Sequence, residues 1–351
     1  MPSKSISFRS QLLSNAHDTL AELGIECART AKLIAGIVSS LAAYTEEGVV
    51  LTPTVFICNS IQSLLQRAGT GEHIVLSGKE PTDAVAAKIL KAAAPLCRGN
   101  WRIYVERSGN GETCQFGVFC GSSDPTSLTV DEVVLETFEA DFPIIRIAQN
   151  AVNRVEVRTN FGNGIEFRFN DDLDVNILDG TAQLRALAKA IARDVPSLKD
   201  QFASFVERML SEAIRECHGT LIAVIPLDSD IPDPLADAVA IDPPLDLFER
   251  FRVHGEEGKT SDSVSRIQTA SELVGGFIQS DGITIFSSAG SVVCFRAFIK
   301  NDASAPPSVG GARSRAYTAM KQLLGTELRV AFFRSQDGRM DVSPADEGAN
   351  D

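Results

Sequence analysis

The sequence predicts an α/β protein: an α+β module with antiparallel hairpins, then a helical connector, then a second module with a mixed sheet. Three observations predict this. The chain has 351 residues, more than one hydrophobic core usually supports. Apolar residues alternate with polar ones after residue 100, as in hairpins. The run 221–225 is entirely apolar, which is typical of a strand buried on both faces.

Composition and charge exclude several classes of protein. Hydrophobic residues make up 44% and charged residues 23%, which is globular and excludes wholesale disorder or a collagen-like repeat. The formal net charge of −13 argues against a protein that coats nucleic acid, because phosphate neutralisation needs a basic surface. A small basic pocket for a nucleotide remains compatible with this charge.

The sequence indicates a cytoplasmic protein with neither a membrane nor a nucleic-acid partner. The N-terminus is polar, and the most apolar early run, 33–38, is too short to span a bilayer. Seven cysteines without a CxxC pair favour reduced thiols over disulfides or a zinc site. The adjacent pair Cys217-His218 is too small a ligand set for a metal, so we interpret it as a helix end.

Apolar spacing predicts the elements of the first module, which we place at residues 1–177. Helical spacing covers 10–45 and 82–96, with Thr82 or Asp83 as a helix cap. Extended segments are expected at 49–58, 74–78, 101–105, 114–120, 155–157 and 165–169, and the last two flank the turn 160–164.

The connector is expected at 178–218 and the second module at 219–343, followed by an acidic tail at 344–351. Two helices fill the connector, and Ser197-Leu198-Lys199-Asp200 resembles a capping box for the second. The second module alternates strand and helix, with a Pro/Asp-rich loop at 226–244. Its strands are expected at 221–225, 283–286, 292–295 and 328–333, and its helices at 245–251, 263–279 and 316–324.

Asp281-Gly282 lies between an expected helix and an expected buried strand. A carboxylate there can point into a cleft, while glycine allows a ligand or a backbone to come close. The alternative is an ordinary turn, because Asp-Gly is a common turn pair and occurs twice more in this chain. Taken alone, this fragment favours the turn.

Gly310-Gly311 leads into a helix whose first turn contains Arg313 and Arg315. The positive charge of an arginine at a helix N-terminus interacts unfavourably with the helix macrodipole, so an anionic partner would stabilise it. Free backbone amides and two guanidinium groups at that end make a phosphate-binding arrangement. The alternative is a solvent-exposed basic turn, which this fragment alone predicts equally well.

Taken together, the two fragments resemble the catalytic domain of the bacterial diadenylate cyclases. That family has Asp-Gly-Ala and, about thirty residues later, Gly-Thr-Arg-His-Arg at a helix start. This chain has Asp281-Gly282-Ile283 and Gly311-Ala312-Arg313-Ser314-Arg315. The segments 219–225, 292–298 and 330–336 resemble strands of the family. The last resembles the family's strand that ends in a serine beside the ATP site, here Ser335. The resemblance covers residues 219–343 and not residues 1–175.

The resemblance implies that two ATP molecules condense into cyclic di-AMP, a second messenger, and two pyrophosphates. Asp281 would hold Mg²⁺ or Mn²⁺ and help orient the attacking 3′-hydroxyl, and Gly282 would let the nucleotide approach the backbone. Arg313 and Arg315 would bind phosphates, with the amides of Gly311 and Ala312 nearby, and Ser335 would contact a phosphate or the metal shell. Two ATP-loaded protomers must then meet face to face, so a homodimer or higher homo-oligomer is implied.

Three positions depart from the family pattern: Ile283 and Ser314 replace alanine and histidine, and Ala312 replaces a hydroxyl side chain. The leading interpretation is an active cyclase whose N-terminal module is a sensor that regulates output. The alternative is a catalytically silent homologue that binds a nucleotide as a regulatory or interaction module.

Overall fold

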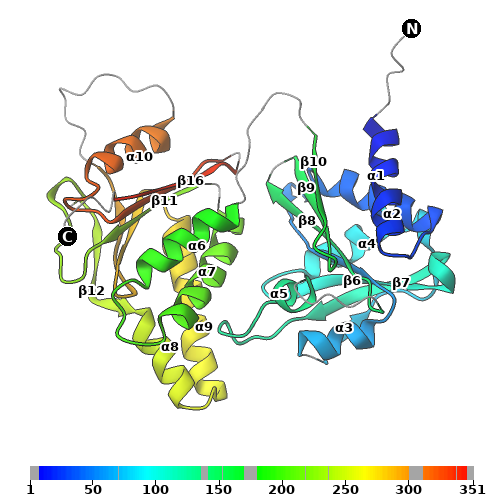
Figure 1. Ribbon diagram of the computed structural model, residues 1–351, viewed down its shortest axis with the longest axis horizontal. Helices are drawn as coiled ribbons and strands as arrows, with labels where there is room; N and C mark the ends of the chain where they lie inside the picture. Colours follow the sequence, from blue (N-terminus) through cyan, green and yellow to red (C-terminus); the bar gives the residue numbers. More distant parts are fainter. Residues whose placement is uncertain are drawn as a thin grey trace, which may run out of the picture. The chain divides into compact units, whose positions relative to one another are not determined.

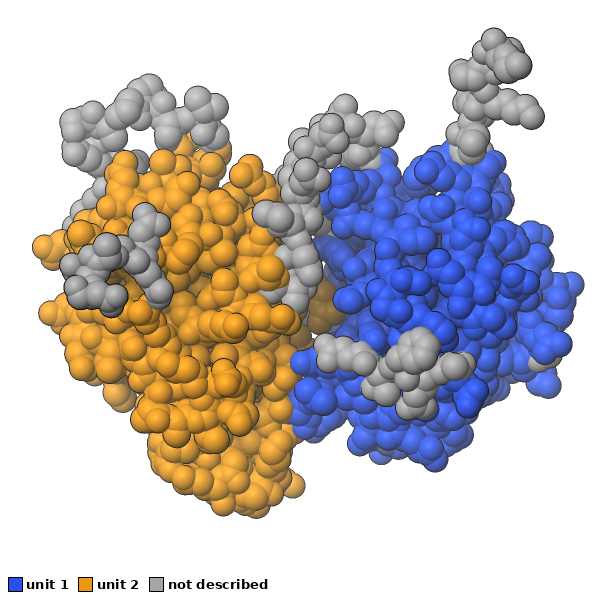
Figure 2. Space-filling model, in the orientation of Figure 1, with its two compact units in different colours: residues 1–123, 127–174 blue, residues 124–126, 175–351 orange. Residues whose placement is uncertain are grey.

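The computed structural model describes residues 8–69, 71–135, 141–151, 153–169, 180–217, 219–235, 237–299, 311–336 and 338–345. The chain divides into two compact units (Figure 2). Unit 1 contains residues 1–123 and 127–174, and unit 2 contains residues 124–126 and 175–351. The expected module boundary after residue 177 lies outside the described residues, as do Gly310 and the tail from residue 346.

Unit 1 is built on one mixed sheet with the strand order β10-β9-β8-β3-β6-β7-β4, and β5 pairs with β7. β3 and β6 are parallel, whereas the other neighbours are antiparallel. A separate pair joins β1 (Thr45–Glu46) to β2 (Val49–Val50). The strands of the large sheet are β3 (Val55–Cys58), β4 (His73–Val75), β5 (Glu80–Pro81), β6 (Trp101–Ser108), β7 (Thr113–Cys120), β8 (Ile145–Ala151), β9 (Arg154–Thr159) and β10 (Gly164–Arg168).

Helices cover both faces of this sheet because its central strands are apolar on both sides. The side chains of Val55, Ile103 and Ile147 pack with α1, α2 and α4. Phe56 and Tyr104, one residue along in their strands, pack with α3 and α5 on the opposite face. The helices are α1 (Phe8–Glu22), α2 (Ala28–Leu41), α3 (Ile61–Ala68), α4 (Ala86–Ala93) and α5 (Val130–Leu135), with short 3₁₀ turns η1 (Thr82–Ala84), η2 (Ala94–Leu96) and η3 (Gly109–Gly111).

Unit 2 has a six-stranded mixed sheet with the order β12-β14-β13-β11-β15-β16. β11 and β13 are parallel, and every other neighbouring pair is antiparallel. β11 is buried along its whole length, as its apolar sequence predicts. The strands are β11 (Thr220–Ile225), β12 (Val239–Asp246), β13 (Ile283–Ser287), β14 (Ser291–Ala297), β15 (Val330–Arg334) and β16 (Met340–Pro344).

The helices of unit 2 form a layer on each side of the sheet, with α10 on one face and α6, α7 and α9 on the other (Figure 1). The segment expected to be a connector is therefore part of unit 2: Leu187, Phe205 and Leu210 share one core with Ile222 and Phe332 of the sheet. The helices are α6 (Gly180–Ile191), α7 (Lys199–Glu216), α8 (Leu247–Glu256), α9 (Ser261–Gln279) and α10 (Ala312–Gln322), with the 3₁₀ turn η4 (Asp233–Leu235).

These elements confirm the predicted α/β class. The central strand β8 and the helices α3 and α5 were not expected, and other differences lie at edges and caps. β12 occupies the second half of the expected Pro/Asp-rich loop, and β16 was not expected. The expected capping box at α7 is wrong, because the N-cap residue is Leu198 in the left-handed conformation, with φ 51°, and no side chain caps the helix.

Candidate functional site

The topology of unit 2 brings Asp281 and Ser335 to the same edge of the sheet. β11 lies between β13 and β15, and Leu221 is in register with both Ile283 and Phe333. β13 runs parallel to β11, whereas β15 runs antiparallel. The residues just before Ile283 and just after Phe333 therefore meet at one edge, although more than fifty residues separate them in the sequence.

The N-terminus of α10 completes this edge. Gly311 is the N-cap residue, with φ −69° and ψ 170°, and no side-chain hydrogen bond caps the helix. The first turn contains no acidic residue. The backbone N–H groups of a helix's first turn have no partner within the helix, so this end attracts anions.

A cavity of about 410 Å³ opens where these elements meet. Its described lining combines a carboxylate, a guanidinium, two hydroxyls, an amide and an aromatic ring. The lining residues are Asp281, Gly311, Ala312, Arg313, Ser314, Phe333, Ser335 and Gln336. Six of the nine site residues expected from the sequence thus surround one cavity: Asp281, Gly311, Ala312, Arg313, Ser314 and Ser335.

The other three expected residues do not line this cavity. Ile283 is 1% exposed and belongs to the core between the sheet and α10. Arg315, the fourth residue of α10, is exposed. Gly282 has φ +101°, and a Cβ there would lie 2.9 Å from Cα of Arg296 and 3.0 Å from the carbonyl oxygen of Ala297. Close packing against β14 therefore accounts for this glycine without a ligand.

Phe333 and Gln336 line the cavity but were not expected from the sequence. Phe333 stacks on Tyr317 of α10, with ring centroids 5.4 Å apart and an interplanar angle of 23°. The Tyr317 hydroxyl lies 2.9 Å from Oγ of Ser343, and burial raises the pKa of Tyr317 to about 12. This wall of the cavity is thus a neutral, closely packed aromatic pair. The only sequence signal for Phe333 and Gln336 was their proximity to Ser335 in the chain.

The lining residues suit a divalent cation only together with a bound anion. The described part of the chain contains no group of three or more His, Cys, Asp or Glu residues that could hold a metal ion. Asp281 is the only carboxylate among the described lining residues. Mg²⁺ is commonly held by one or two carboxylates together with substrate phosphates, so Asp281 fits such a site when a phosphorylated ligand supplies the remaining oxygens.

Comparison of the chain with family models, with curated proteins and with solved structures finds no match in any of the three. Among the described residues, no helix combines the length and the apolar character needed to cross a membrane.

Proposed function

We propose that the protein is a diadenylate cyclase, which condenses two ATP molecules into cyclic di-AMP and two pyrophosphates. The observation that supports this most strongly is the shared cavity: Asp281 and Arg313 come from separate segments of the chain and both line it. A carboxylate and a guanidinium at a helix N-terminus that share one cavity suit phosphoryl transfer from a nucleotide, because the reaction depends on charge neutralisation and alignment.

In this proposal Arg313 and the first amides of α10 bind the phosphates of ATP and fix the α-phosphate in the cavity. Asp281 orients the incoming 3′-hydroxyl and accepts its proton. The new bond joins that 3′-oxygen to the α-phosphorus, the bond from the α-phosphorus to the bridging oxygen breaks, and pyrophosphate leaves. Mg²⁺ or Mn²⁺ beside Asp281, when bound, would neutralise phosphate charge. Ser335 would contact a phosphate or the metal shell.

The reaction needs two copies of the site. Each cavity holds one ATP, and each 3′-hydroxyl attacks the α-phosphate of the other nucleotide, so two protomers must face each other in a homodimer or higher homo-oligomer. We further propose that the protein works in the cytoplasm, where ATP is plentiful and where its seven free cysteines would stay reduced. Unit 1 would then act as the sensor that regulates output.

The direct test is incubation of the purified protein with ATP and Mn²⁺ or Mg²⁺, with chromatographic detection of cyclic di-AMP. Asp281→Asn should abolish the product. Asp237→Asn is the matched control, because it removes an exposed carboxylate of unit 2 that does not line the cavity. Loss of activity in neither variant, or in both equally, would contradict the role of Asp281.

A second candidate is a silent nucleotide-binding homologue with a regulatory role. It is favoured by Ser314, which lines the cavity where the cyclase family has a histidine and which cannot carry a positive charge. This candidate predicts that ATP stabilises the protein without turnover. Ligand at a hundred times its dissociation constant should stabilise the folded state by about 2.7 kcal/mol. A thermal shift with no product in any metal would select this candidate, and neither shift nor product would exclude both.

Phosphate binding is tested separately from catalysis. A charge-assisted contact contributes about 1.5–3 kcal/mol, so Arg313→Ala should weaken ATP binding by roughly tenfold to a hundredfold in calorimetric titration. Lys321→Ala is the control, because Lys321 is a cation on the same helix that lies over the Tyr317 ring, 5.0 Å from its centroid, and does not line the cavity. Arg315→Ala reports whether the second guanidinium also reaches the phosphates. Unchanged ATP affinity in Arg313→Ala would contradict the phosphate role.

A further inference from the structure

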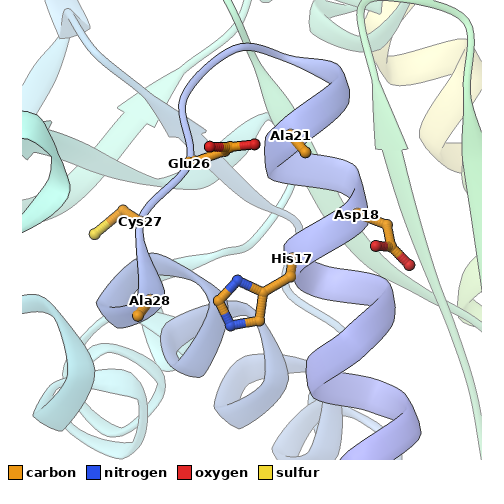
Figure 3. Close-up of a pocket in the computed structure, with 6 residues that line it drawn as sticks. All are labelled: His17, Asp18, Ala21, Glu26, Cys27 and Ala28. Carbon is orange, nitrogen blue, oxygen red and sulfur yellow. The ribbon is translucent and has the colours of Figure 1, made fainter.

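Unit 1 has its own cavity, of about 420 Å³, at the junction of α1 and α2 (Figure 3). Its described lining consists of His17, Asp18, Ala21, Glu26, Cys27 and Ala28. Cys27 is the N-cap residue of the 14-residue helix α2 and is half-buried. Figure 3 shows the Cys27 sulfur pointing away from the His17 ring, so His17 is not placed to act as its base.

A buried arginine, Arg107, lies close to Cys27. Arg107 is 6% exposed. It donates hydrogen bonds to the Thr30 hydroxyl, the Asn59 side-chain oxygen and the Ile25 carbonyl, each at 3.1 Å. All three acceptors are uncharged, and within the described part of the chain Arg107 forms no ion pair with a carboxylate. Burying a charge without an opposite charge beside it is energetically unfavourable, so a nearby anion would stabilise Arg107.

The Cys27 sulfur is positioned to be that anion. A Cβ placed on Gly111 would lie 2.5 Å from a terminal nitrogen of Arg107 and 3.0 Å from Sγ of Cys27, so the two atoms are at most 5.5 Å apart. Burial lowers the pKa of the Arg107 guanidinium, and the nearby Cys27 sulfur opposes that shift. Gly111 has φ +89°, a conformation in which glycine allows the backbone to approach both groups.

The N-terminus of α2 stabilises the same negative charge. As a neutral thiol, Cys27 makes no capping hydrogen bond. Burial raises the pKa of the Cys27 thiol, but hydrogen bonds from the Thr30 and Arg29 amides and the Thr30 hydroxyl, together with the Arg107 charge, outweigh burial and leave this pKa below its usual value. The helix dipole acts in the same direction.

The other charges around Cys27 are already paired or oppose the thiolate. Arg29 forms ion pairs with Glu112 at 2.8 Å and with Asp83 at 3.6 Å, so most of its charge is neutralised. Asp18 and Glu26 line the cavity and disfavour a second negative charge. Arg107 is therefore the cation whose charge favours a thiolate at Cys27, in addition to the hydrogen bonds from Thr30 and Arg29.

We propose that Cys27 is a redox-modification site, at which the thiolate held by Arg107 and the N-terminus of α2 reacts with peroxides to form a sulfenate. The sulfur attacks one peroxide oxygen and a sulfur–oxygen bond forms as the oxygen–oxygen bond breaks. With hydrogen peroxide, the hydroxide that leaves becomes water when it takes up a proton. The sulfur is oxidised by two electrons and the peroxide is reduced. This inference is independent of the proposed cyclase activity, because the whole site lies in unit 1.

The chain contains internal controls for this proposal. Cys97 and Cys120 are half-buried like Cys27, but burial raises the pKa of Cys97 to about 12 and also raises the pKa of Cys120. All three residues are partly exposed, but burial dominates at Cys97 and Cys120 despite the nearby Arg102 charge, whereas hydrogen bonds and the Arg107 charge outweigh burial at Cys27. The remaining cysteines, Cys58, Cys114, Cys217 and Cys294, are buried.

The experiment measures alkylation of the full-length reduced protein by iodoacetamide between pH 5 and pH 9, with each cysteine followed by peptide mass spectrometry. Cys27 should react at least about tenfold faster than Cys97 and Cys120 at pH 7, because the thiolate is the nucleophile. Treatment with hydrogen peroxide in the presence of dimedone should place the sulfenate adduct on Cys27. Equal rates at the three positions, or an adduct confined to Cys97 or Cys120, would overturn the proposal.

Two variants test the cause of the reactivity. Thr30→Val removes the hydroxyl while keeping the shape and the backbone amide, and Arg107→Lys removes the planar donor set. Both should move the midpoint of the Cys27 alkylation profile to higher pH and slow its reaction at pH 7, with Cys97 and Cys120 unchanged. Unchanged rates at Cys97 and Cys120 show that the variant is folded. If Cys27 keeps its profile in both folded variants, the assignment to Arg107 is wrong.

Discussion

Gly282 packs against the sheet and does not line the cavity. The resemblance to the cyclases suggested that this glycine lets a nucleotide lie against the backbone. The structure places the backbone of β14 there, at 2.9 Å from the position of a Cβ. The adjacent Asp281 lines the cavity while Gly282 does not, so two neighbouring residues of one short motif do different work.

Gly282→Ala should destabilise unit 2 by about 1–3 kcal/mol, because the residue has φ +101° and its Cβ would meet backbone atoms. Urea unfolding measures this loss. Gly276→Ala is the control: Gly276 lies inside α9, nothing lies within 4 Å of its Cβ position, and alanine should stabilise the helix by about 0.5–1 kcal/mol. Equal stability of the two variants would mean that Gly282 is not held in this conformation.

The candidate site shows how far sequence alone could lead at the scale of residues. Asp281 and Arg313 could be named from their short motifs once the two were taken together, and Ser335 from the resemblance to the cyclases. Phe333 and Gln336 could not be named, since an aromatic residue in an apolar strand usually belongs to the core. Their place at the cavity follows from the direction in which β15 runs, which no local pattern contains.

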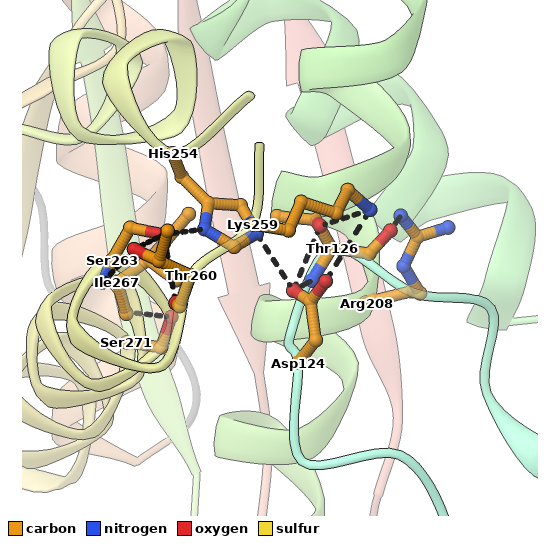
Figure 4. Close-up of polar contacts among 9 residues, drawn as sticks. All are labelled: Asp124, Thr126, Arg208, His254, Lys259, Thr260, Ser263, Ile267 and Ser271. Carbon is orange, nitrogen blue, oxygen red and sulfur yellow. Dashed lines mark hydrogen bonds and ion pairs between the residues drawn. The ribbon is translucent and has the colours of Figure 1, made fainter. Parts of the chain in front are cut away.

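The short segment Asp124–Thr126 is attached to unit 2 by buried polar contacts (Figure 4). An Oδ1 atom of Asp124 lies 3.2 Å from Nε2 of His254 in α8, and Lys259 lies 3.3 Å from Oδ2. Arg208 of α7 donates to the Thr126 carbonyl at 3.0 Å. His254 is 1% exposed, and its Nδ1 lies 2.8 Å from the Ser263 hydroxyl at the start of α9. Two helices, α7 and α8, and the α8–α9 loop thus contact the turn at residues 124–126, and α9 is linked to it through His254.

The pKa of Asp124 predicts an acid-sensitive contribution to stability. Burial raises this pKa, but hydrogen bonds from the Thr126 amide and hydroxyl, with the Lys259 and His254 charges, outweigh burial and lower it from 3.8 to about 2. A carboxyl group whose pKa is lower in the folded state stabilises that state above pH 4, and this contribution disappears as the pH falls toward 2.

Asp124→Asn should therefore lower the free energy of unfolding by about 1–2 kcal/mol at pH 6, after allowance for solvent screening. The difference from the unmodified protein should disappear near pH 2. Urea unfolding at several pH values gives both quantities. Asp230→Asn, which changes an exposed carboxylate of unit 2, should show no such difference. A cost that does not vary with pH would show that packing, and not charge, holds Asp124.

Whether an element could be predicted depended on how strongly burial shapes its sequence. β11 is apolar throughout because both of its faces are covered, so its pattern was unambiguous. β12 is mostly exposed and lies at the sheet edge, where proline is tolerated. Because it contains Pro243 and Pro244, its sequence is typical of a loop. The start of α7 was misplaced because Leu198 adopts a backbone conformation that its side chain does not favour.

At the scale of the whole molecule, the hydrophobic cores do not mix between the units. The cores around α2 and α3 consist of residues up to 169, and the cores around α7 and α10 consist of residues from 184 onward. The sequence predicted two modules with a boundary near residue 178, which lies outside the described residues. It did not show that α6 and α7 belong to the core of unit 2, because an amphipathic helix does not reveal its partner.

Separate cores should give separate responses in differential scanning calorimetry. Ile34→Ala should destabilise only unit 1, and Phe286→Ala only unit 2, by about 2–5 and 3–5 kcal/mol respectively, because both side chains are fully buried. ATP with Mg²⁺ should raise only the transition that Phe286→Ala lowers. A single transition that both substitutions lower equally would show that the units unfold together.

The assignment of Asp124–Thr126 to unit 2 has a practical consequence for anyone who expresses this protein in pieces. A fragment that begins at residue 175 lacks the carboxylate beside His254 and the carbonyl that Arg208 binds, although neither loss is visible from the chain's linear order. Such a fragment would lose the contacts that residues 124–126 make with α7, α8 and the loop after α8. Supplying the missing stretch as a synthetic peptide, or grafting it onto the new N-terminus, should restore its resistance to proteolysis.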